Sequence, residues 1–247
     1  NKLYASLLST IENLEEEKRK VSEAEQSKID FLRAASHELK TPVTALNAIL
    51  ENMILGVGKY KDRDTCLLEC REITGQLSFM IKEILDTSRL DFTQEGKGVE
   101  TFDLSETLPV VCEPYQLIAT AKMISFSLSM QGKCPVHTSK KGLEKILSNL
   151  LSNAVAYTKP GCKITVILNA RQIKIENECT PIPPDKLAHV FEPFYRPDFA
   201  RDRKDGGNGL GLYIVDTLSK ALELPYQFVA TEDPQGMCFT LFLKRSE

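Results

Sequence analysis

The first 92 residues carry apolar side chains at a helical spacing that one short loop interrupts. Gly56 and Gly58 lie in that loop, and glycine commonly ends a helix. Two antiparallel helices joined by so short a loop form an αα-hairpin. One hairpin cannot bury two apolar stripes, so we expect residues 29–92 to form a homodimer as a four-helix bundle. The stripes comprise Leu46, Ile49 and Met53 before the loop and Leu67, Cys70, Thr74, Leu77, Ile81 and Ile84 after it.

Residues 1–28 predict a linker helix that carries a weak coiled coil into this hairpin. Neither Gly nor Pro occurs in the first 30 residues. The seam is a broken heptad, because Lys18 stands at one of its apolar positions. A solvated, fraying helix is therefore the alternative. The apolar seam residues are Leu7, Ile11, Leu14 and Val21.

Residues 31–43, FLRAASHELKTPV, predict a helix that displays one imidazole on its solvent side. Leu32, Ala35 and Leu39 lie three and four positions apart and form one apolar stripe. At about 100° per residue, His37 points away from that stripe. The helix therefore combines a buried seam with an exposed histidine.

Two further side chains extend this exposed face around His37. Glu38 follows it directly, and Thr41 lies one helical turn beyond, roughly 6 Å along the same face. Pro42 is expected to bend or break the helix just after Thr41. The combination differs from an ordinary solvated histidine, although the Thr41 hydroxyl could simply bond back to the preceding turn.

Beyond a linker at residues 93–100, the apolar period changes from helical to alternating. Residues 124–130 alternate apolar side chains with serine, as an amphipathic strand does. Such separate runs of strands and helices predict an α+β fold with a helix layer on one face of a mixed sheet. The other expected strands are 163–168, 172–176, 226–231 and 237–243, with turns near Asn169-Ala170 and across residues 233–236, and the expected helices are roughly 105–120, 140–157 and 209–222.

Two segments of this second part suit a metal ion and a phosphate group. Asn149 and Asn153 lie four positions apart on one helix face, and amide oxygens suit Mg²⁺. A solvated polar face is the alternative. Residues 206–212, GGNGLGL, form a glycine-rich turn that runs into a helix, where backbone N–H groups can approach phosphates closely. A flexible loop is the alternative there.

Composition narrows the classes of function. Hydrophobic residues make up 42% of the 247 residues, enough for a core, and a net charge of −3 gives no reason to expect nucleic acid as a partner. The seven cysteines form no C-x-x-C pair, so we expect reduced thiols packed as small apolar groups. No stretch approaches 18 apolar residues, so no membrane span is expected, and a first residue Asn suggests a piece of a longer protein.

These segments occur in the order found in one family of signalling enzymes. Residues 31–43 resemble the phosphoacceptor box of sensor histidine kinases. The Asn helix, the strand pair, Ile182-Pro183, residues 191–196 (FEPFYR) and the glycine turn resemble their ATP-binding domain, which gyrase, Hsp90 and MutL share. The resemblance covers about residues 28–247 and looks closest to the Gram-positive sensors of vancomycin resistance. It implies a Bergerat-type α/β two-layer sandwich over residues 101–247.

The resemblance also implies a role for each residue of the phosphoacceptor box. His37 would accept the γ-phosphoryl group of ATP, and Glu38 would be its base or orienter. Thr41 would position water for dephosphorylating the partner protein.

In the second domain, the resemblance implies a site for ATP and Mg²⁺. Asn153 would hold Mg²⁺ with Asn149 beside it. Residues 197–208 would form a mobile lid over ATP, with Phe191 and Phe194 beneath it and with Arg201, Arg203 and Lys204 on it. The nucleotide-binding residues would be Asn149, Asn153, Tyr157, Asn177, Gly207, Gly209, Leu210 and Gly211.

Two positions depart from the family pattern. Where the family has Asp-x-Gly-x-Gly, whose Asp binds the adenine amino group, this chain has Asn177, Cys179 and Pro181. The Asn oxygen can still accept that hydrogen bond, but a charge-assisted bond becomes a neutral one. The basic residue often found in the Asn helix is here Ala156. Both changes put nucleotide affinity in question.

The resemblance implies the cytosolic part of a membrane-anchored, homodimeric sensor histidine kinase. It would transfer phosphate from Mg-ATP to His37 and on to an Asp of a response-regulator receiver domain, which it would also dephosphorylate. That regulator should dock over Thr41, Thr44 and Ala48. A non-catalytic ATP-gated scaffold or phosphatase-dominant sensor stays open because of Asn177 and Ala156. A gyrase-type or Hsp90-type ATPase stays open too, although the His37 box speaks against it.

Overall fold

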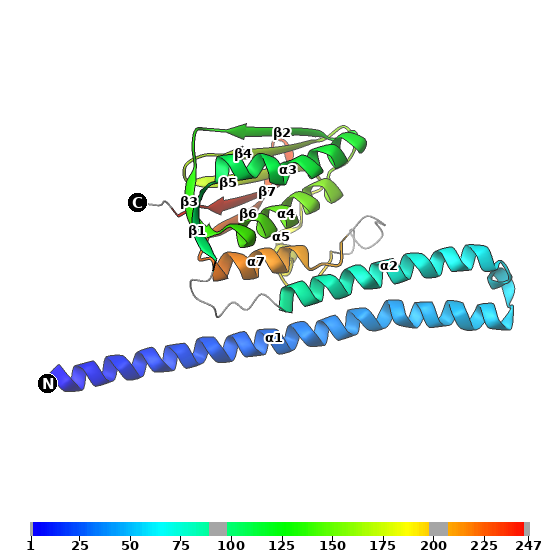
Figure 1. The fold of residues 1–247 in the computed structure, drawn as a ribbon, viewed down its shortest axis with the longest axis horizontal. Helices are drawn as coiled ribbons and strands as arrows, with labels where there is room; N and C mark the ends of the chain where they lie inside the picture. The colour runs from blue at the N-terminus through cyan, green and yellow to red at the C-terminus, as the bar shows by residue number, and fades with distance from the viewer. Residues whose placement is uncertain (1, 89–97, 198–206, 245–247) are drawn as a thin grey trace. The chain divides into compact units, whose positions relative to one another are not determined.

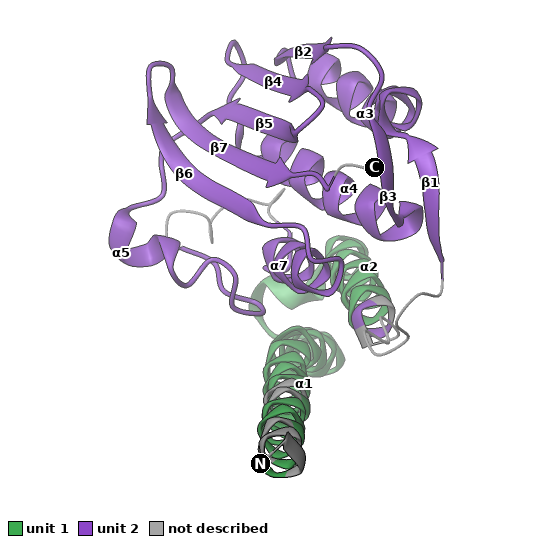
Figure 2. Cartoon of the chain, turned by 90° about the vertical axis from the view of Figure 1, so that its left-hand side faces the viewer, with its two compact units in different colours: residues 1–84 green, residues 85–247 purple. Residues whose placement is uncertain are grey.

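A computed structural model describes residues 2–88, 98–197 and 207–244 of the chain (Figure 1). The chain divides into two compact units, residues 1–84 and residues 85–247 (Figure 2). The first is a pair of helices, and the second combines a sheet with helices. Residues 93–97 of the predicted linker lie outside the described residues.

The first unit is an antiparallel helical hairpin (Figures 1 and 2). Helix α1 spans Lys2–Leu55, the 3₁₀ turn η1 spans Gly58–Lys61, and α2 spans Arg63–Ser88. Gly56, just past the end of α1, has a φ of 64°, which glycine adopts without steric cost. The prediction of a hairpin with a glycine loop is therefore confirmed.

Of the predicted bend or break at Pro42, the break does not occur, because α1 continues through this proline as one helix (Figure 1). Proline removes a single intrahelical donor and leaves the carbonyl of Glu38 without its helical partner. Helix already formed on both sides supplies the remaining hydrogen bonds, since propagation adds one bond per residue once a helix is nucleated. The loss of one bond does not end so long a helix.

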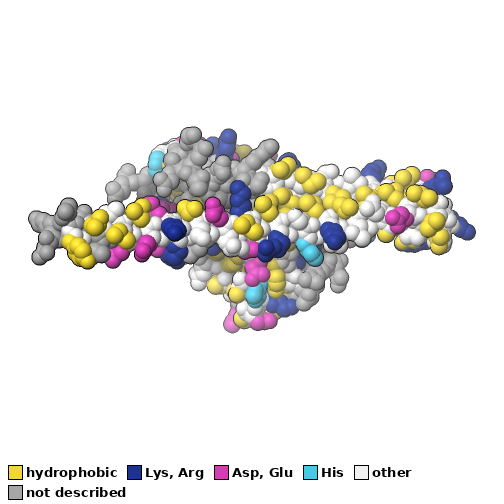
Figure 3. All heavy atoms as spheres, turned by 90° about the horizontal axis from the view of Figure 1, so that it is seen from below, with side chains coloured by type: hydrophobic (Ala, Val, Ile, Leu, Met, Phe, Trp, Pro, Cys, Tyr) yellow, Lys and Arg dark blue, Asp and Glu magenta, His cyan; other side chains and the backbone are white. Residues whose placement is uncertain are grey.

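The buried face of the hairpin is displaced by one residue from parts of the predicted stripes. Phe31 is 3% exposed whereas Leu32 is 45% exposed, and Cys66 is 3% exposed whereas Leu67 is 54% exposed. Ala35 is buried as predicted. Many large apolar side chains consequently remain on the surface of the helices, as Figure 3 shows in yellow. They include Val43, Leu50, Ile54, Leu55, Leu67, Leu68, Phe79 and Ile81.

The second unit packs helices on one face of a mixed sheet, as predicted (Figure 2). Its strand order is β2-β4-β5-β7-β6, with β2 and β4 parallel and the other neighbours antiparallel. The helices are α3 (Leu104–Ala121), α4 (Lys140–Tyr157) and α7 (Gly211–Ala221), and the one-turn α5 spans Pro184–Leu187. The strands are β2 (Ser125–Met130), β4 (Lys163–Leu168), β5 (Gln172–Glu178), β6 (Tyr226–Glu232) and β7 (Gln235–Phe242).

The core of this unit lies between the sheet and the helices. Alternate residues of β4 are fully buried, because side chains of a strand point to opposite faces. The Tyr226 hydroxyl donates to Asp216 Oδ1 at 2.7 Å and ties β6 to α7. Burial, followed by this bond, raises the pKa of Tyr226 well above its usual range. The fully buried residues include Leu143, Ile146, Leu147 and Leu151 of α4 and Ile164, Val166 and Leu168 of β4.

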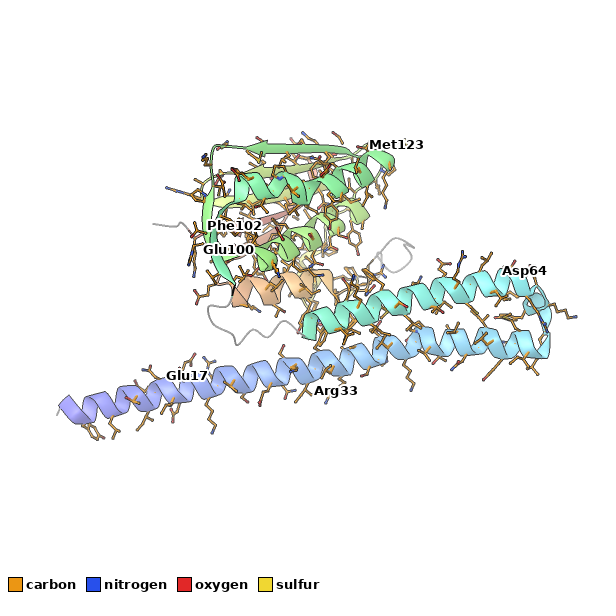
Figure 4. The ribbon with its side chains drawn as sticks, viewed as in Figure 1. Glu17, Arg33, Asp64, Glu100, Phe102 and Met123 are labelled. Carbon is orange, nitrogen blue, oxygen red and sulfur yellow. The ribbon has the colours of Figure 1, made fainter. Side chains whose placement is uncertain are left out.

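A second, two-stranded sheet was not predicted. Strand β1 (Val99–Asp103), which begins inside the predicted linker, pairs antiparallel with β3 (Pro135–Ser139). Asp103 ends β1 and caps α3, because its Oδ1 accepts hydrogen bonds from Ser105 Oγ, Ser105 N and Cys134 N at 2.6, 3.0 and 3.0 Å. These bonds, the Ser105 hydroxyl first, lower the pKa of Asp103. Figure 4 labels Glu100 and Phe102 on β1, at the opposite end of the unit from Met123.

Candidate functional site

Helix α4 presents the two predicted amides from a fixed frame. The Ser139 hydroxyl caps the helix by accepting from Gly142 N at 3.3 Å. Asn149 is only 8% exposed, and its Nδ2 donates to the Lys145 carbonyl at 2.9 Å. That bond sets the orientation of the Asn149 amide, so its Oδ1 points away from the Lys145 carbonyl. Asn153 follows one turn later and is half-buried.

The glycine turn meets these amides at the first residue of α7. A Cβ on Gly211 would stand 3.4 Å from both Asn153 Oδ1 and Nδ2, and 3.6 Å from Asn149 Oδ1. The structure thus brings together the Asn pair and the glycine turn, which lie far apart in sequence. Amide oxygens beside the N–H groups of a helix N-terminus can hold a magnesium ion and a phosphate together.

Gly209 fits against the backbone of Phe194. A Cβ on Gly209 would lie 2.6 Å from the Phe194 carbonyl carbon, and the Gly209 φ of 77° suits glycine. The Phe194 N–H donates to the Gly209 carbonyl at 3.0 Å, and Phe194 itself has a φ of 64°. Two residues in the left-handed backbone conformation therefore pack against each other where the turn enters α7.

The aromatic residue Phe191 anchors the segment before Phe194. Its ring centroid lies 5.3 Å from that of Tyr226 and 6.0 Å from that of Phe228. The predicted lid cannot be described in the same way, because residues 198–206, with Arg201, Arg203 and Lys204, lie outside the described residues.

The remaining predicted residues of the turn differ in what they can contribute. Gly207 is exposed, and a Cβ there would meet nothing within 4 Å. Leu210 is fully buried, so only its backbone could contact a nucleotide. Tyr157 is half-buried at the last turn of α4.

Asn177 is held by two residues that sequence reasoning missed. Its Nδ2 donates to Thr158 Oγ1 at 3.3 Å, and the Thr158 hydroxyl in turn donates to the Ala154 carbonyl at 2.7 Å. The Asn177 Oδ1 makes no hydrogen bond within the described parts of the chain and can accept one. Gly236 of β7 packs so closely that a Cβ would lie 2.2 Å from the Asn177 carbonyl oxygen. The only sequence signals were that Thr158 follows the Asn helix and that Gly236 is the last residue of the predicted turn at 233–236.

His37 stands in the other unit, on the solvent side of α1 as predicted. Its side chain is 81% exposed, and its Nδ1 lies 3.5 Å from Glu38 Oε1. The hydroxyls of Ser36 and Thr44 each donate to the carbonyl four residues back, at 2.8 Å. The exposed Thr41 hydroxyl makes no such bond to any described residue. The predicted bond from Thr41 back to the preceding turn is therefore absent from this part of the chain.

Two kinds of feature are absent from the described residues. No group of three or more His, Cys, Asp or Glu side chains that could hold a metal ion occurs there. A metal at α4 and α7 would rely on amide oxygens and on the oxygens of a bound phosphate. Among the same residues, none of the helices is long and apolar enough to cross a membrane.

Comparison with known families agrees with both parts of the chain. Residues 27–93 match the His Kinase A (phospho-acceptor) domain. Residues 138–247 match the family described as histidine kinase-, DNA gyrase B-, and HSP90-like ATPase. The exposed His37 and the Asn–Gly cluster each fall within one of these matches.

Sequence relatives include sensor kinases of Streptococcus pneumoniae and Enterococcus faecalis. The chain is 32% identical over 243 residues to sensor histidine protein kinase HK06 of Streptococcus pneumoniae, covering 98% of the chain and 54% of the relative. It is 34% identical over 245 residues to sensor protein VanSB of Enterococcus faecalis, covering 98% of the chain and 54% of the relative. The chain thus spans about half the length of these curated relatives.

Solved structures share the fold. Acinetobacter baumannii histidine kinase AdeS aligns with a TM-score of 0.63 at 24% identity, over 85% of this chain and 98% of that one. Full-length ShkA in complex with AMPPNP aligns with a TM-score of 0.61 at 21% identity, over 87% of this chain and 47% of that one. With a phosphoacceptor hairpin and an ATPase-type α/β domain in this order, and sensor kinases as relatives along 98% of its length, the chain belongs to the sensor histidine kinases.

Proposed function

We propose that the chain phosphorylates His37 from Mg-ATP bound in its second unit and passes the phosphoryl group to an Asp of a response regulator. The observation that carries this proposal is the position of Gly211, where a Cβ would stand 3.4 Å from the Asn153 amide and 3.6 Å from Asn149 Oδ1. It brings helix N–H groups and amide oxygens together without an intervening side chain. Phosphoryl transfer depends on such positioning and charge neutralisation more than on covalent help.

Glu38 would orient the His37 ring for attack. A carboxylate that accepts from Nδ1–H stabilises the tautomer in which Nε2 carries the lone pair. Nε2 then forms a bond to the γ-phosphorus while the bond to the β,γ-bridging oxygen breaks, and ADP leaves with that electron pair. Bound Mg²⁺, held by Asn153 with Asn149 beside it, would neutralise phosphate charge during this step.

Asn177 would select the adenine base. Its Nδ2 is engaged by Thr158, which leaves Oδ1 to accept from the adenine amino group. The backbone N–H groups around Gly209 and Gly211 would contact the phosphates. The side chain at Asn177 is neutral, so this hydrogen bond should be weaker than the one a family Asp makes.

Two surfaces of the hairpin would bind protein partners. The large exposed apolar side chains of α1 and α2, among them Leu68 and Phe79, would become buried in a homodimeric four-helix bundle. The receiver domain would dock over Thr41, Thr44 and Ala48, which are all exposed. The open Thr41 hydroxyl would then orient water toward the phosphoaspartate. Membrane anchoring of a longer protein stays a prediction from the resemblance.

Incubation with γ-labelled ATP tests the proposed kinase activity. Wild type should acquire label that acid releases and base does not, as expected of phosphohistidine. His37→Gln should abolish the label, and His137→Gln, a matched change at another exposed histidine, should leave it unchanged. Label that persists in His37→Gln would refute the assignment of the acceptor.

A non-catalytic ATP-gated scaffold is the second candidate, favoured by Asn177 at the family's Asp position. In that case an ATP analogue with Mg²⁺ should bind and change the protection of backbone amides from hydrogen exchange, yet no phosphoprotein should form. The label experiment thus separates the two functions.

A further inference from the structure

Two cysteines, Cys162 and Cys179, flank the same end of the β4–β5 ladder. The antiparallel register ends at the pair Ile164 and Asn177. Continuing that register by two residues on each strand places Cys162 directly opposite Cys179. These two positions are separated by a turn and two strands in sequence, but they are neighbours across the sheet.

Each residue lies one position outside its strand, Cys162 just before β4 and Cys179 just after β5, and each still makes one hydrogen bond toward a neighbouring strand. The Cys162 carbonyl accepts from Ser125 N at 2.9 Å, toward β2, and the Cys179 N–H donates to the Gln235 carbonyl at 3.3 Å, toward β7. Their backbone polar groups thus point away from each other, which is the arrangement of a non-hydrogen-bonded pair. In such pairs the Cα atoms are about 4.5 Å apart, and bridged cysteines need about 4.4–6.8 Å.

The two side chains also share a face of the sheet. Extending the alternation of side chains one residue past each strand puts Cys162 on the side of the buried Ile164 and Cys179 on the side of Asn177. Between the cysteines, Lys163 N donates to Glu178 Oε2 at 3.0 Å and closes the end of the ladder.

Exposure distinguishes this pair from the other cysteines. Cys162 and Cys179 are half-exposed, whereas the prediction of packed thiols holds for the remaining five, which are buried. A small oxidant can therefore reach this pair. The buried five are Cys66, Cys70, Cys112, Cys134 and Cys238.

We propose that Cys162 and Cys179 form a reversible disulfide, closed by a peroxide and reopened by a thiol reductant. Two thiols lose two electrons and two protons as the S–S bond forms. Hydrogen peroxide takes up these two electrons and two protons, its O–O bond breaks, and two water molecules result. A disulfide exposed at the edge of a domain belongs to the reducible, regulatory kind.

The bridge would clamp two segments that carry the nucleotide site, a consequence that rests on the proposed function. Thr158 precedes Cys162 by four residues, Asn177 precedes Cys179 by two, and the hydrogen bond from Asn177 to Thr158 already joins the same two segments. A covalent link fixes them before ATP arrives. Binding then costs less ordering, so affinity should rise.

Peptide mapping without reductant tests the disulfide in the whole chain. After titration with hydrogen peroxide, wild type should yield one linked peptide pair containing Cys162 and Cys179, and its Tm should exceed that of the dithiothreitol-treated protein. Cys162→Ser and Cys179→Ser should each lose both responses. A matched control, Cys66→Ala with Cys70→Ala, should keep them. Cysteines that stay reduced, oxidise singly or link separate chains would overturn the proposal.

Calorimetry with an ATP analogue tests the clamp. Oxidised wild type should bind several-fold more tightly than reduced wild type, and the Cys162→Ser variant should show no difference between the two conditions. Equal or weaker binding by the oxidised protein would overturn the link to the nucleotide site. If reduced wild type binds no nucleotide, the proposed function fails while the mapped disulfide stands, so the two failures are distinguishable.

Discussion

Replacing Gly209 with alanine is the sharpest test of the glycine turn. The new Cβ would lie 2.6, 2.8 and 2.9 Å from the carbonyl carbon, Cα and carbonyl oxygen of Phe194. All three are backbone atoms, so no side-chain rotation can relieve the contact. The Gly209 φ of 77° adds a second penalty, because alanine is strained in the left-handed region.

The two penalties set the size of the expected effect. A left-handed conformation costs a non-glycine residue roughly 1–2 kcal/mol. An extra methyl group forced into a packed site costs about 1–3 kcal/mol. In Gly209→Ala, the conformation in which residue 209 packs against Phe194 should therefore be destabilised by about 2–5 kcal/mol relative to other conformations of the turn. Affinity for a ligand that needs this conformation falls with its population, by up to about 25-fold at the lower figure.

Calorimetry with Mg²⁺ and an ATP analogue measures this loss, and Gly207→Ala is the matched control. A Cβ on Gly207 meets nothing within 4 Å, so that variant should bind like wild type. Thermal unfolding run in parallel separates a local change from global unfolding. Wild-type affinity and Tm in Gly209→Ala would refute the reasoning, because the contact with Phe194 would then have no energetic consequence.

Four further changes test separate parts of the chain. Gly211→Ala should lower nucleotide affinity by placing a methyl group beside the Asn amides, where the ligand would bind, while Tm stays level or rises, since alanine favours a helix by about 1 kcal/mol. Asn177→Asp should tighten ATP binding up to about tenfold, because bonds to charged groups are worth about 1.5–3 against 0.5–1.5 kcal/mol, but Tm should fall since aspartate cannot donate to Thr158. Asp103→Ala should cost about 0.5–2 kcal/mol by loss of the α3 cap. The depressed pKa of Asp103 means that its stabilisation holds above the ordinary aspartate range and is lost in acid, so urea melts of variant and wild type should converge there. Thr41→Ala should leave autophosphorylation and Tm unchanged while regulator dephosphorylation falls at least tenfold, about 1.4 kcal/mol in barrier, and an equal loss of both rates would contradict its catalytic role.

Local signals predicted much of the second unit. The expected helix at 140–157 and strand at 163–168 agree with α4 and β4, because the cap at Ser139 and the apolar spacing lie within the segments themselves. The order of strands and helices was likewise enough for the mixed sheet with one helix layer. Such features depend on neighbours in sequence, which a pattern can report.

Non-local pairing explains the main omissions. Strand β1 pairs with β3 across the whole of α3 and β2, as in Thr101 opposite His137, so no turn signal joins the two strands. On the hairpin, Phe31 and Leu32 are adjacent and both apolar, and either could begin a helical stripe. The spacing established the period of the buried face, but the contacts of the folded chain decided its phase.

The glycine turn shows most clearly what residue spacing does not predict, namely which atoms lie opposite each residue in the folded chain. In the sequence, Gly207, Gly209 and Gly211 are the same residue type at equal spacing, and the resemblance assigns all three to the phosphates. In the structure Gly207 faces open space, Gly209 meets the backbone of a loop, and Gly211 meets two amides of another helix. The requirement for glycine comes from the opposing atoms, which belong to segments remote in sequence. Where glycine packs against backbone atoms, a side chain would disturb the fold itself. Where glycine lies beside two amides, a side chain is compatible with folding, and only the bound ligand requires its absence. The three alanine substitutions should therefore differ in kind: one silent, one that disturbs conformation and binding together, and one that disturbs binding alone.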